Sequence, residues 1–327
     1  MDVLVTGGAG FIGGHLAERF VRDGHDVVVL DNFDPYYDVR LKEHNVEAGR
    51  AAAADGDGSY RLVEGDVRDA ELVAELVTST DVVSHHAAQA GVRADIDPRK
   101  YHEVNVDGTL NVLDAARGTD LRRVVLASSS SVYGTAQYLP YDEAHPTKPV
   151  SPYGASKLAA ERYGMVYADR YNLPIVALRY FTVYGPRMRP GMAISNFVSR
   201  CANGEPPEIY GDGSKTRDFT FVEDIVSVNR TLLESDAADG ETMNVGSGGT
   251  ISIEELAETV RDAMAPELDL IYTTGYDIDA EHTHASVEKA GELLGYEPTR
   301  TIEEGVAEFV EWYRENQEWY EPLVRGE

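Results

Sequence analysis

The chain is poor in cysteine and has no long apolar run. Only one of its 327 residues, Cys201, is a cysteine, so no disulfide can form within the chain. No apolar stretch approaches the roughly 18 residues that a membrane-spanning helix needs, and no basic and apolar leader precedes the first apolar segment. We therefore expect a cytoplasmic protein without a membrane partner.

Positive charge is also scarce. The 29 lysines and arginines, of which only six are lysines, face 57 aspartates and glutamates, and the formal net charge is −28. This acidity argues against DNA or RNA as a partner, because nucleic-acid affinity depends on basic side chains. The acids are spread along the chain, which favours a halophilic protein, since salt screens their repulsion. An acidic enzyme kept soluble by its charge would have the same composition.

Glycines mark the most informative stretch, which begins DVLVTGGAGFIGGHLAERF. An apolar segment at residues 3–5 is followed by Gly7, Gly10 and Gly13, and a second apolar segment ends in Asp31. A strand, three glycines opening a helix, and an acid about 20 residues later form the dinucleotide-binding pattern. The glycines let a pyrophosphate approach a helix N-terminus, while Asp31 can bind ribose hydroxyls and repel a 2′-phosphate. The sequence therefore predicts NAD as the cofactor rather than NADP.

Strands and helices alternate beyond this motif. We expect strands within residues 60–67, 81–88, 122–129 and 177–181, and a helix within residues 101–117. Such alternation predicts an α/β protein with a Rossmann-type doubly wound parallel sheet.

The expected domain organisation follows from a change in composition. An NAD-binding domain is predicted over residues 1–179, and a smaller C-terminal substrate-binding lobe over residues 180–327 consists of short mixed elements. The chain is expected to return to the main sheet near residues 241–247. The tract AGRAAAADGDGS, residues 48–59, is predicted to be a solvated loop.

Two further motifs indicate chemistry. The segment ASSSSVYG, residues 127–134, follows a predicted strand at the sheet end where ligands bind in open α/β folds. Tyr153 and Lys157 are spaced i, i+4 in SPYGASK, so they lie on one helix face. An ammonium near a phenol favours the phenolate, so we expect Lys157 to lower the pKa of Tyr153. Tyr153 is thus a candidate general base for a hydroxyl group, and one of the serines can bind the same oxygen.

Taken together, these motifs resemble the extended branch of the short-chain dehydrogenase/reductase superfamily, which contains nucleotide-sugar epimerases and dehydratases. The resemblance covers nearly the whole chain and rests on TGGAGFIG, HHAAQAGVR, NVDGTLNVLDAA, SSSSVYG, YGASK, RYFTVYGPR and GDGSKTRDFTFVEDIV. It implies that Ser129 acts with Tyr153 and Lys157, and that NAD accepts a hydride from C4 of a UDP-sugar and returns it. A homodimer is the family expectation. The cofactor-binding residues that it implies are Gly7, Gly10, Phe11, Ile12, Gly13, Asp31, Asn32, Asp66, Val67, Ala87, Ala88, Asn105, Tyr153, Lys157 and Tyr180.

The segment YFTVYGPRMRP gives evidence on which sugar the protein binds. Many epimerases of neutral UDP-sugars resemble RYFN at this point, whereas Thr182 followed by VYGP and Arg189 resembles UDP-glucuronate 4-epimerases, in which these two residues hold the sugar carboxylate. A surface ion pair and a diphosphate contact remain alternatives for Arg189, and Arg187 is expected to be a bystander. Dehydratases carry acids where this chain has Ser130 and Ser131, which favours simple epimerisation.

The predicted function is therefore NAD-dependent C4 epimerisation of a UDP-sugar, with UDP-glucuronate and UDP-galacturonate the preferred pair. The implied substrate-binding residues are Ser130, Ser131, Thr182, Arg189, Asn196 and Arg217. The alternatives are a 4-epimerase of UDP-glucose and UDP-galactose or of N-acetylhexosamine forms, a nucleotide-sugar dehydratase or decarboxylase, and a non-catalytic nucleotide-binding module. No metal is expected, because the i, i+2 pair His282 and His284 has no supporting acid or cysteine pattern.

Overall fold

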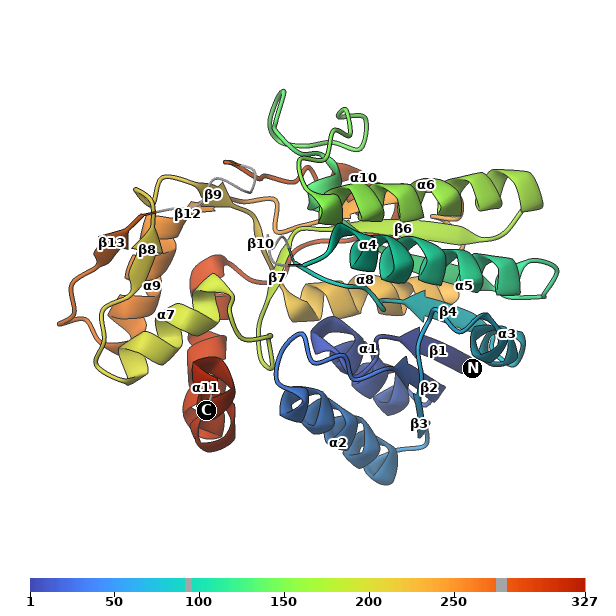
Figure 1. The fold of residues 1–327 in the computed structure, drawn as a ribbon, viewed down its shortest axis with the longest axis horizontal. Coiled ribbons are helices and arrows are strands. Elements are labelled where there is room, and N and C mark those ends of the chain that lie inside the picture. Colours follow the sequence, from blue (N-terminus) through green and yellow to red (C-terminus); the bar gives the residue numbers. More distant parts are fainter. Residues whose placement is uncertain (92–95, 275–280, 327) are drawn as a thin grey trace.

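A seven-stranded parallel sheet is the centre of the molecule in the computed structural model, which describes residues 1–91, 96–274 and 281–326 (Figure 1). Its strand order is β11-β6-β5-β4-β1-β2-β3. The order reverses between β1 and β4, and ligands bind beyond such a reversal in open α/β sheets. The predicted Rossmann-type doubly wound sheet is confirmed. The strands are β1 (Asp2–Thr6), β2 (Asp26–Asp31), β3 (Ser59–Glu64), β4 (Val82–His85), β5 (Arg123–Ser129), β6 (Ile175–Tyr180) and β11 (Thr242–Val245).

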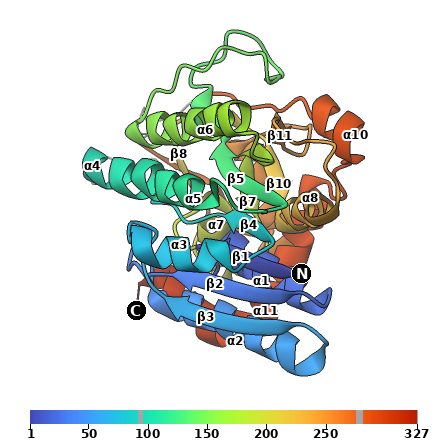
Figure 2. The same cartoon turned by 90° about the vertical axis from the view of Figure 1, so that its right-hand side faces the viewer.

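Helices cover both faces of this sheet, with α3, α5 and α6 on one face and α1, α2 and α8 on the other (Figure 2). All six residues of β6 are buried, as expected for a strand covered on both sides. Of the helices in the described part of the chain, none combines the length and apolarity needed to cross a bilayer. The helices are α1 (Phe11–Arg22), α2 (Val39–Asp55), α3 (Ala70–Thr78), α4 (Pro98–Tyr101), α5 (Gly108–Ala116), α6 (Pro152–Tyr171) and α8 (Val222–Glu234).

The remaining elements are short strands and further helices, one of them 24 residues long, and several of these elements stand to one side of the sheet in Figure 1. Three two-stranded sheets pair β7 with β10, β9 with β12, and β8 with β13. Leu178 of β6 shares one hydrophobic core with Phe197 of α7, Leu256 of α9 and Phe309 of α11, so these elements are packed firmly onto the sheet. The elements are β7 (Thr182–Tyr184), α7 (Ala193–Ala202), β8 (Glu208–Tyr210), β9 (Thr216–Arg217), β10 (Phe219–Phe221), β12 (Ile251–Ser252), α9 (Ile253–Met264), β13 (Ile271–Thr273), α10 (Glu288–Leu294) and α11 (Ile302–Arg325).

One sequence-based expectation is wrong. The tract at residues 48–59 is not a loop, because α2 continues through most of it and ends at Asp55. Alanine has the highest helix propensity, and Ala52 is buried on the inner side of this helix. The following glycines, Gly56 and Gly58, end the helix before β3 begins.

The helix predicted within residues 101–117 is interrupted. A π-helical stretch, His102–Asp107, separates α4 from α5. Such bulges are rare and occur frequently at functional sites. Asn105 lies in this stretch and is 1 % exposed, so the altered winding directs a polar side chain into the interior.

A buried ion pair joins β6 to α6. The Arg179 guanidinium donates two hydrogen bonds to Glu161, at 2.7 and 2.9 Å, and the two side chains are 3 % and 0 % exposed. Ser128 also donates to Glu161, at 2.7 Å. This network fixes the carboxyl end of strand β5 against α6, the helix that carries Tyr153.

We expect Glu161→Gln to lower the free energy of unfolding by about 3 kcal/mol, because it leaves the buried Arg179 charge uncompensated. Urea denaturation measures the change. Glu308→Gln is the matched control, since it breaks the exposed pair with Arg300 and should change stability by less than about 1 kcal/mol. Similar losses in the two variants would show that burial does not set the strength of the pair.

Candidate active site

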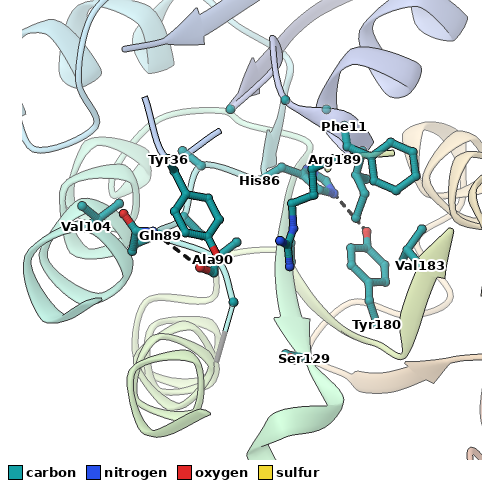
Figure 3. Close-up of a pocket in the computed structure, with 18 of the residues that line it drawn as sticks. Phe11, Tyr36, His86, Gln89, Ala90, Val104, Ser129, Tyr180, Val183 and Arg189 are labelled. Carbon is teal, nitrogen blue, oxygen red and sulfur yellow. Dashed lines mark hydrogen bonds between the residues drawn. The ribbon is translucent and has the colours of Figure 1, made fainter. Parts of the chain in front are cut away.

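A cavity of about 690 Å³ opens at the carboxyl ends of the central strands (Figure 3). Its wall combines segments that follow β1, β2, β4, β5 and β6 with the first turn of α6. Most residues predicted for the site lie in this wall. They are Gly7, Gly10, Phe11, Ile12, Gly13, Asp31, Asn32, Val67, Ala87, Ala88, Ser129, Ser130, Ser131, Tyr153, Lys157, Tyr180, Thr182 and Arg189.

The glycine segment between β1 and α1 has the shape that a dinucleotide needs. Gly7 has a positive φ of 67°, and a Cβ at Gly13 would lie 2.3 Å from the Gly7 carbonyl oxygen. Gly10 is the N-cap of α1. Because glycine has no side chain, no capping hydrogen bond is made to the free N–H groups of the helix. The first turn of α1 therefore presents unsatisfied donors and a partial positive charge to the cavity, as an anion site requires.

Asp31 lies at the end of β2 with a cation beside it. Its carboxylate accepts a hydrogen bond of 2.9 Å from the Lys42 ammonium, and both side chains are less than 10 % exposed. Backbone N–H groups of Ala9 and Phe33 also donate to it, at 3.2 and 2.9 Å. Asp31 is thus held rigidly in the cavity wall, and Lys42 offsets part of its negative charge.

Four predicted site residues lie outside the cavity wall. Asp66 is bound to Arg68 and Asn32, and the hydrogen bond from Arg68 lowers the pKa of its carboxyl to about 2. Asn105 bonds to the backbone of Gln89 and to the Ser156 hydroxyl. Asn105 therefore supports the cavity wall without lining it, because it joins the segment after β4, at Gln89, to helix α6, at Ser156.

The other two predicted residues belong to the C-terminal elements. Arg217 donates to the backbone oxygens of Thr216 and Glu281, at 2.8 and 3.0 Å. Asn196 lies in α7 and is partly buried. Their predicted contacts with the substrate therefore remain predictions.

The candidate catalytic residues meet where β5 ends and α6 begins. Ser129 is the last residue of β5 and pairs in register with Tyr180 of β6. Ser151 caps α6 by accepting from the Gly154 N–H at 3.1 Å, and this fixes the turn that carries Tyr153. Lys157 follows one turn later and is 7 % exposed. Ser129, Tyr153 and Lys157 all face the same cavity.

The acid–base properties of this group differ from the expectation. Burial raises the pKa of Tyr153, while a hydrogen bond with Ser129 and the positive charge of Arg189 act in the opposite direction. Burial also lowers the pKa of Lys157 to about 8, against the charge of Glu161. The predicted net lowering of the phenol pKa by Lys157 is therefore not found in the protein alone, because removal from water outweighs the nearby charges.

The two arginines of the YFTVYGPRMRP segment have different environments. Arg187 forms an ion pair with Glu18 of α1 at 2.6 Å, and it also contacts Nδ1 of His15 at 3.0 Å. Arg189 lies in the cavity wall together with Thr182. Among the residues that the structure describes, no carboxylate lies within ion-pair distance of Arg189. The surface ion pair considered as an alternative for Arg189 is therefore not found with the described carboxylates.

Several wall residues were not singled out from the sequence. Lys42 could have been found, because it lies on the same helical stripe as the buried residues Asn45, Val46 and Gly49. His86 bonds to the Tyr180 hydroxyl at 3.0 Å, and burial lowers its pKa to about 3, so it is neutral.

The neighbouring tyrosines Tyr36 and Tyr37 are also in the wall, on the loop between β2 and α2. No spacing rule in the sequence links this loop to the other segments of the cavity wall.

Comparisons with known proteins show the family of this chain. Residues 4–309 match the family described as GDP-mannose 4,6 dehydratase. The chain belongs to this family. A relative named "Probable UDP-glucuronate 4-epimerase" from Rhizobium meliloti is 36% identical, with 97% of this chain and 98% of the relative covered. The predicted membership among nucleotide-sugar epimerases and dehydratases is confirmed.

Solved structures of this family superpose closely on the chain. UDP-glucuronic acid 4-epimerase from Bacillus cereus, solved with UDP-glucuronic acid and NAD, has a TM-score of 0.89 at 31% identity and covers 96% of this chain and 99% of its own. UDP-glucose 4-epimerase from Thermotoga maritima, solved with UDP-glucose, has a TM-score of 0.87 at 30% identity and covers 97% and 100%. The similarity of the overall fold therefore does not distinguish an epimerase of acidic UDP-sugars from an epimerase of neutral ones.

Proposed function

We propose that this protein is an NAD-dependent UDP-sugar 4-epimerase that interconverts UDP-glucuronate and UDP-galacturonate. Relatives named as UDP-sugar 4-epimerases cover nearly the whole chain, and the Bacillus cereus structure contains NAD, so the class expected from the sequence is confirmed. The choice of an acidic sugar rests on one observation. Arg189 and Thr182 line the same cavity as Ser129, Tyr153 and Lys157, and Arg189 has no carboxylate partner among the described residues.

The cavity wall fits NAD on its own geometry. The free N–H groups of the first turn of α1 suit a pyrophosphate, and the close packing of Gly7 and Gly13 leaves room for it. Asp31 is fixed at the strand end where ribose hydroxyls bind in this motif. In this proposal, Tyr180 and the Ala87–Ala88 segment lie along the cofactor, while Asp66 and Asn105 act only through neighbouring residues.

In the proposed reaction, Tyr153 removes the proton from the sugar 4-hydroxyl and later returns it to the 4-keto oxygen. Ser129 donates a hydrogen bond to the same sugar oxygen, and this stabilises the charge that develops there. Lys157 is placed on the same helix face, where its ammonium stabilises the phenolate. Bound NAD supplies the hydride acceptor and donor for C4. Inversion then requires that the keto sugar present its other face before hydride returns.

A 4-epimerase of a glucuronate needs to hold the sugar carboxylate, so that CO₂ is not lost during the reaction. Oxidation at C4 makes a β-keto acid, which loses CO₂ readily. Arg189 offers a planar pair of N–H donors that matches a carboxylate, and Thr182 offers a hydroxyl nearby in the wall. Ser130 and Ser131 carry no carboxyl group that could eliminate water from the sugar. This combination supports epimerisation without dehydration or decarboxylation.

The direct experiment incubates the enzyme with each UDP-sugar, in low and high salt, and follows the products by NMR. Formation of UDP-galacturonate from UDP-glucuronate is the expected result. A UDP-pentose would indicate a decarboxylase, and turnover of UDP-glucose or UDP-N-acetylglucosamine alone would indicate an epimerase of neutral sugars. Full turnover only at high salt would support the proposed halophilic adaptation, for which the net charge of −28 is the argument.

We expect Arg189→Met to move the rising limb of the pH profile of kcat/KM to higher pH. This profile reports ionisations of the free enzyme, in which burial raises the pKa of Tyr153 and the positive charge of Arg189 partly offsets that rise. Without that charge, a higher pH is needed to deprotonate the phenol. Arg189→Lys, which keeps the charge, should leave the limb near its wild-type position. An unmoved limb, or one at lower pH, in the methionine variant would contradict this assignment.

The proposal includes a cytoplasmic homodimer. Helix α6 supports self-association, because Tyr163 and Val166 on it are 43 % and 55 % exposed and lie one turn apart. Sedimentation of the purified chain measures the oligomeric state.

A further inference from the structure

The loop between β2 and α2 reaches the part of the cavity wall that contains Arg189. The Tyr36 ring, from this loop, lies beside the Arg189 guanidinium in Figure 3, and the central carbon of the guanidinium is 5.6 Å from the ring centroid. This distance is within the range of a cation–π interaction. Two segments about 150 residues apart in sequence therefore meet at the candidate carboxylate-binding side chain.

Tyr36 is itself held in place by several contacts. Its backbone N–H donates to the Asp34 carboxylate at 3.0 Å, and Asp34 forms an ion pair with Lys100 of α4 at 2.8 Å. The Tyr36 hydroxyl lies against Gly91, where a Cβ would approach it to 2.3 Å. Tyr101 in turn donates to the Gly91 carbonyl oxygen at 2.6 Å. The ring is thus part of a supported layer and offers Arg189 a fixed surface.

An aromatic partner has a particular consequence for a binding arginine. A carboxylate would also hold the guanidinium, but it would neutralise the charge and occupy the N–H donors. The face of a ring stabilises the cation without accepting its in-plane hydrogen bonds. Arg187 shows the contrast, because its ion pair with Glu18 already takes up its charge. Arg189, placed over the Tyr36 ring, has its N–H donors available for a ligand, and no described carboxylate offsets its charge.

We infer that Tyr36 is a positioning residue that determines the preference for an acidic over a neutral sugar, by holding the Arg189 guanidinium in place with its N–H donors directed to a ligand. This inference rests on the proposed function. Tyr36 does not need to touch the sugar in order to act, because its effect is transmitted through Arg189. The ring, rather than the hydroxyl, is the part that matters for this role.

The test measures dissociation constants for UDP-glucuronate and UDP-glucose by calorimetry, with the NAD-loaded protein carrying Tyr153→Phe to prevent turnover. The parent is expected to bind UDP-glucuronate more tightly. Tyr36→Leu should reduce that preference about ten-fold, because it removes a partly buried cation–π contact, whereas Tyr36→Phe should keep most of it. Tyr210→Leu, at an exposed tyrosine outside the cavity wall, is the control and should change nothing.

A double-mutant cycle separates positioning from a general structural effect. In a protein that already carries Arg189→Ala, Tyr36→Leu should cause no further loss of preference, whereas an additional loss would overturn the inference. If the parent prefers UDP-glucuronate and Tyr36→Leu leaves that preference unchanged, the inference fails and the proposed function stands. If the parent shows no preference, the acidic-sugar function fails, and the inference fails with it. The thermal unfolding midpoint and the NAD content confirm that each variant is folded.

Discussion

Tyr153→Phe is expected to lower kcat by about 10²- to 10⁴-fold, which is the range for loss of a general base. The phenylalanine keeps the ring that packs against Tyr101, at a centroid distance of 6.0 Å, so the cavity should keep its shape. The only group removed is the hydroxyl. Burial raises the pKa of this hydroxyl, and Ser129 and Arg189 partly offset the rise. Turnover, measured by NMR, should therefore fall, whereas affinity for the UDP-sugar, measured by calorimetry, should be almost unchanged.

Tyr163→Phe is the matched control for this prediction. Tyr163 lies on the same helix, is 43 % exposed and is outside the cavity wall, so its hydroxyl has no role in the proposed reaction. This variant should retain wild-type turnover. Unchanged turnover in Tyr153→Phe would contradict the mechanism, and a parallel loss of UDP-sugar affinity would indicate that the hydroxyl holds the ground state rather than acting as a base.

The sheet and the catalytic elements could be predicted because local patterns determine them. The apolar segments that became β1, β2 and β5 are buried on both faces, and such strands read as continuous apolar runs. The i, i+4 spacing of Tyr153 and Lys157 needed only the helix that was expected there. The glycine spacing likewise predicted the tight turn before α1.

Other features could not be predicted, because they depend on the approach of distant segments or on the degree of burial. The contact between Tyr36 and Arg189 exists only once the β2–α2 loop and the segment after β7 are folded onto one cavity. The sign of the pKa shift at Tyr153 depends on how far the phenol is removed from water, which spacing does not give. The alanine tract at residues 48–59 was misread because its glycines and aspartates outweighed the helix propensity of its alanines.

Arg189→Ala is expected to reduce kcat/KM for UDP-glucuronate by about 10²-fold or more, because a sugar carboxylate would then be buried without its charged partner. Activity on UDP-glucose, where it exists, should fall by less than about ten-fold, since a neutral sugar never used that contact. Affinities measured in the Tyr153→Phe background give the same comparison when turnover of the neutral sugar is too slow to follow. Equal losses for both sugars would assign Arg189 to the diphosphate, which the two substrates share.

Arg187→Ala provides the contrasting result within the same segment. Its guanidinium is 12 % exposed and paired with Glu18, which keeps a second ion pair with Arg22, so its removal should lower the free energy of unfolding by only about 1–2 kcal/mol without changing the preference between the two sugars. Urea denaturation and the ratio of kcat/KM values measure the two effects separately. A change of preference in Arg187→Ala as large as that in Arg189→Ala would mean that the segment acts as a unit. The distinct roles assigned to its two arginines would then be wrong.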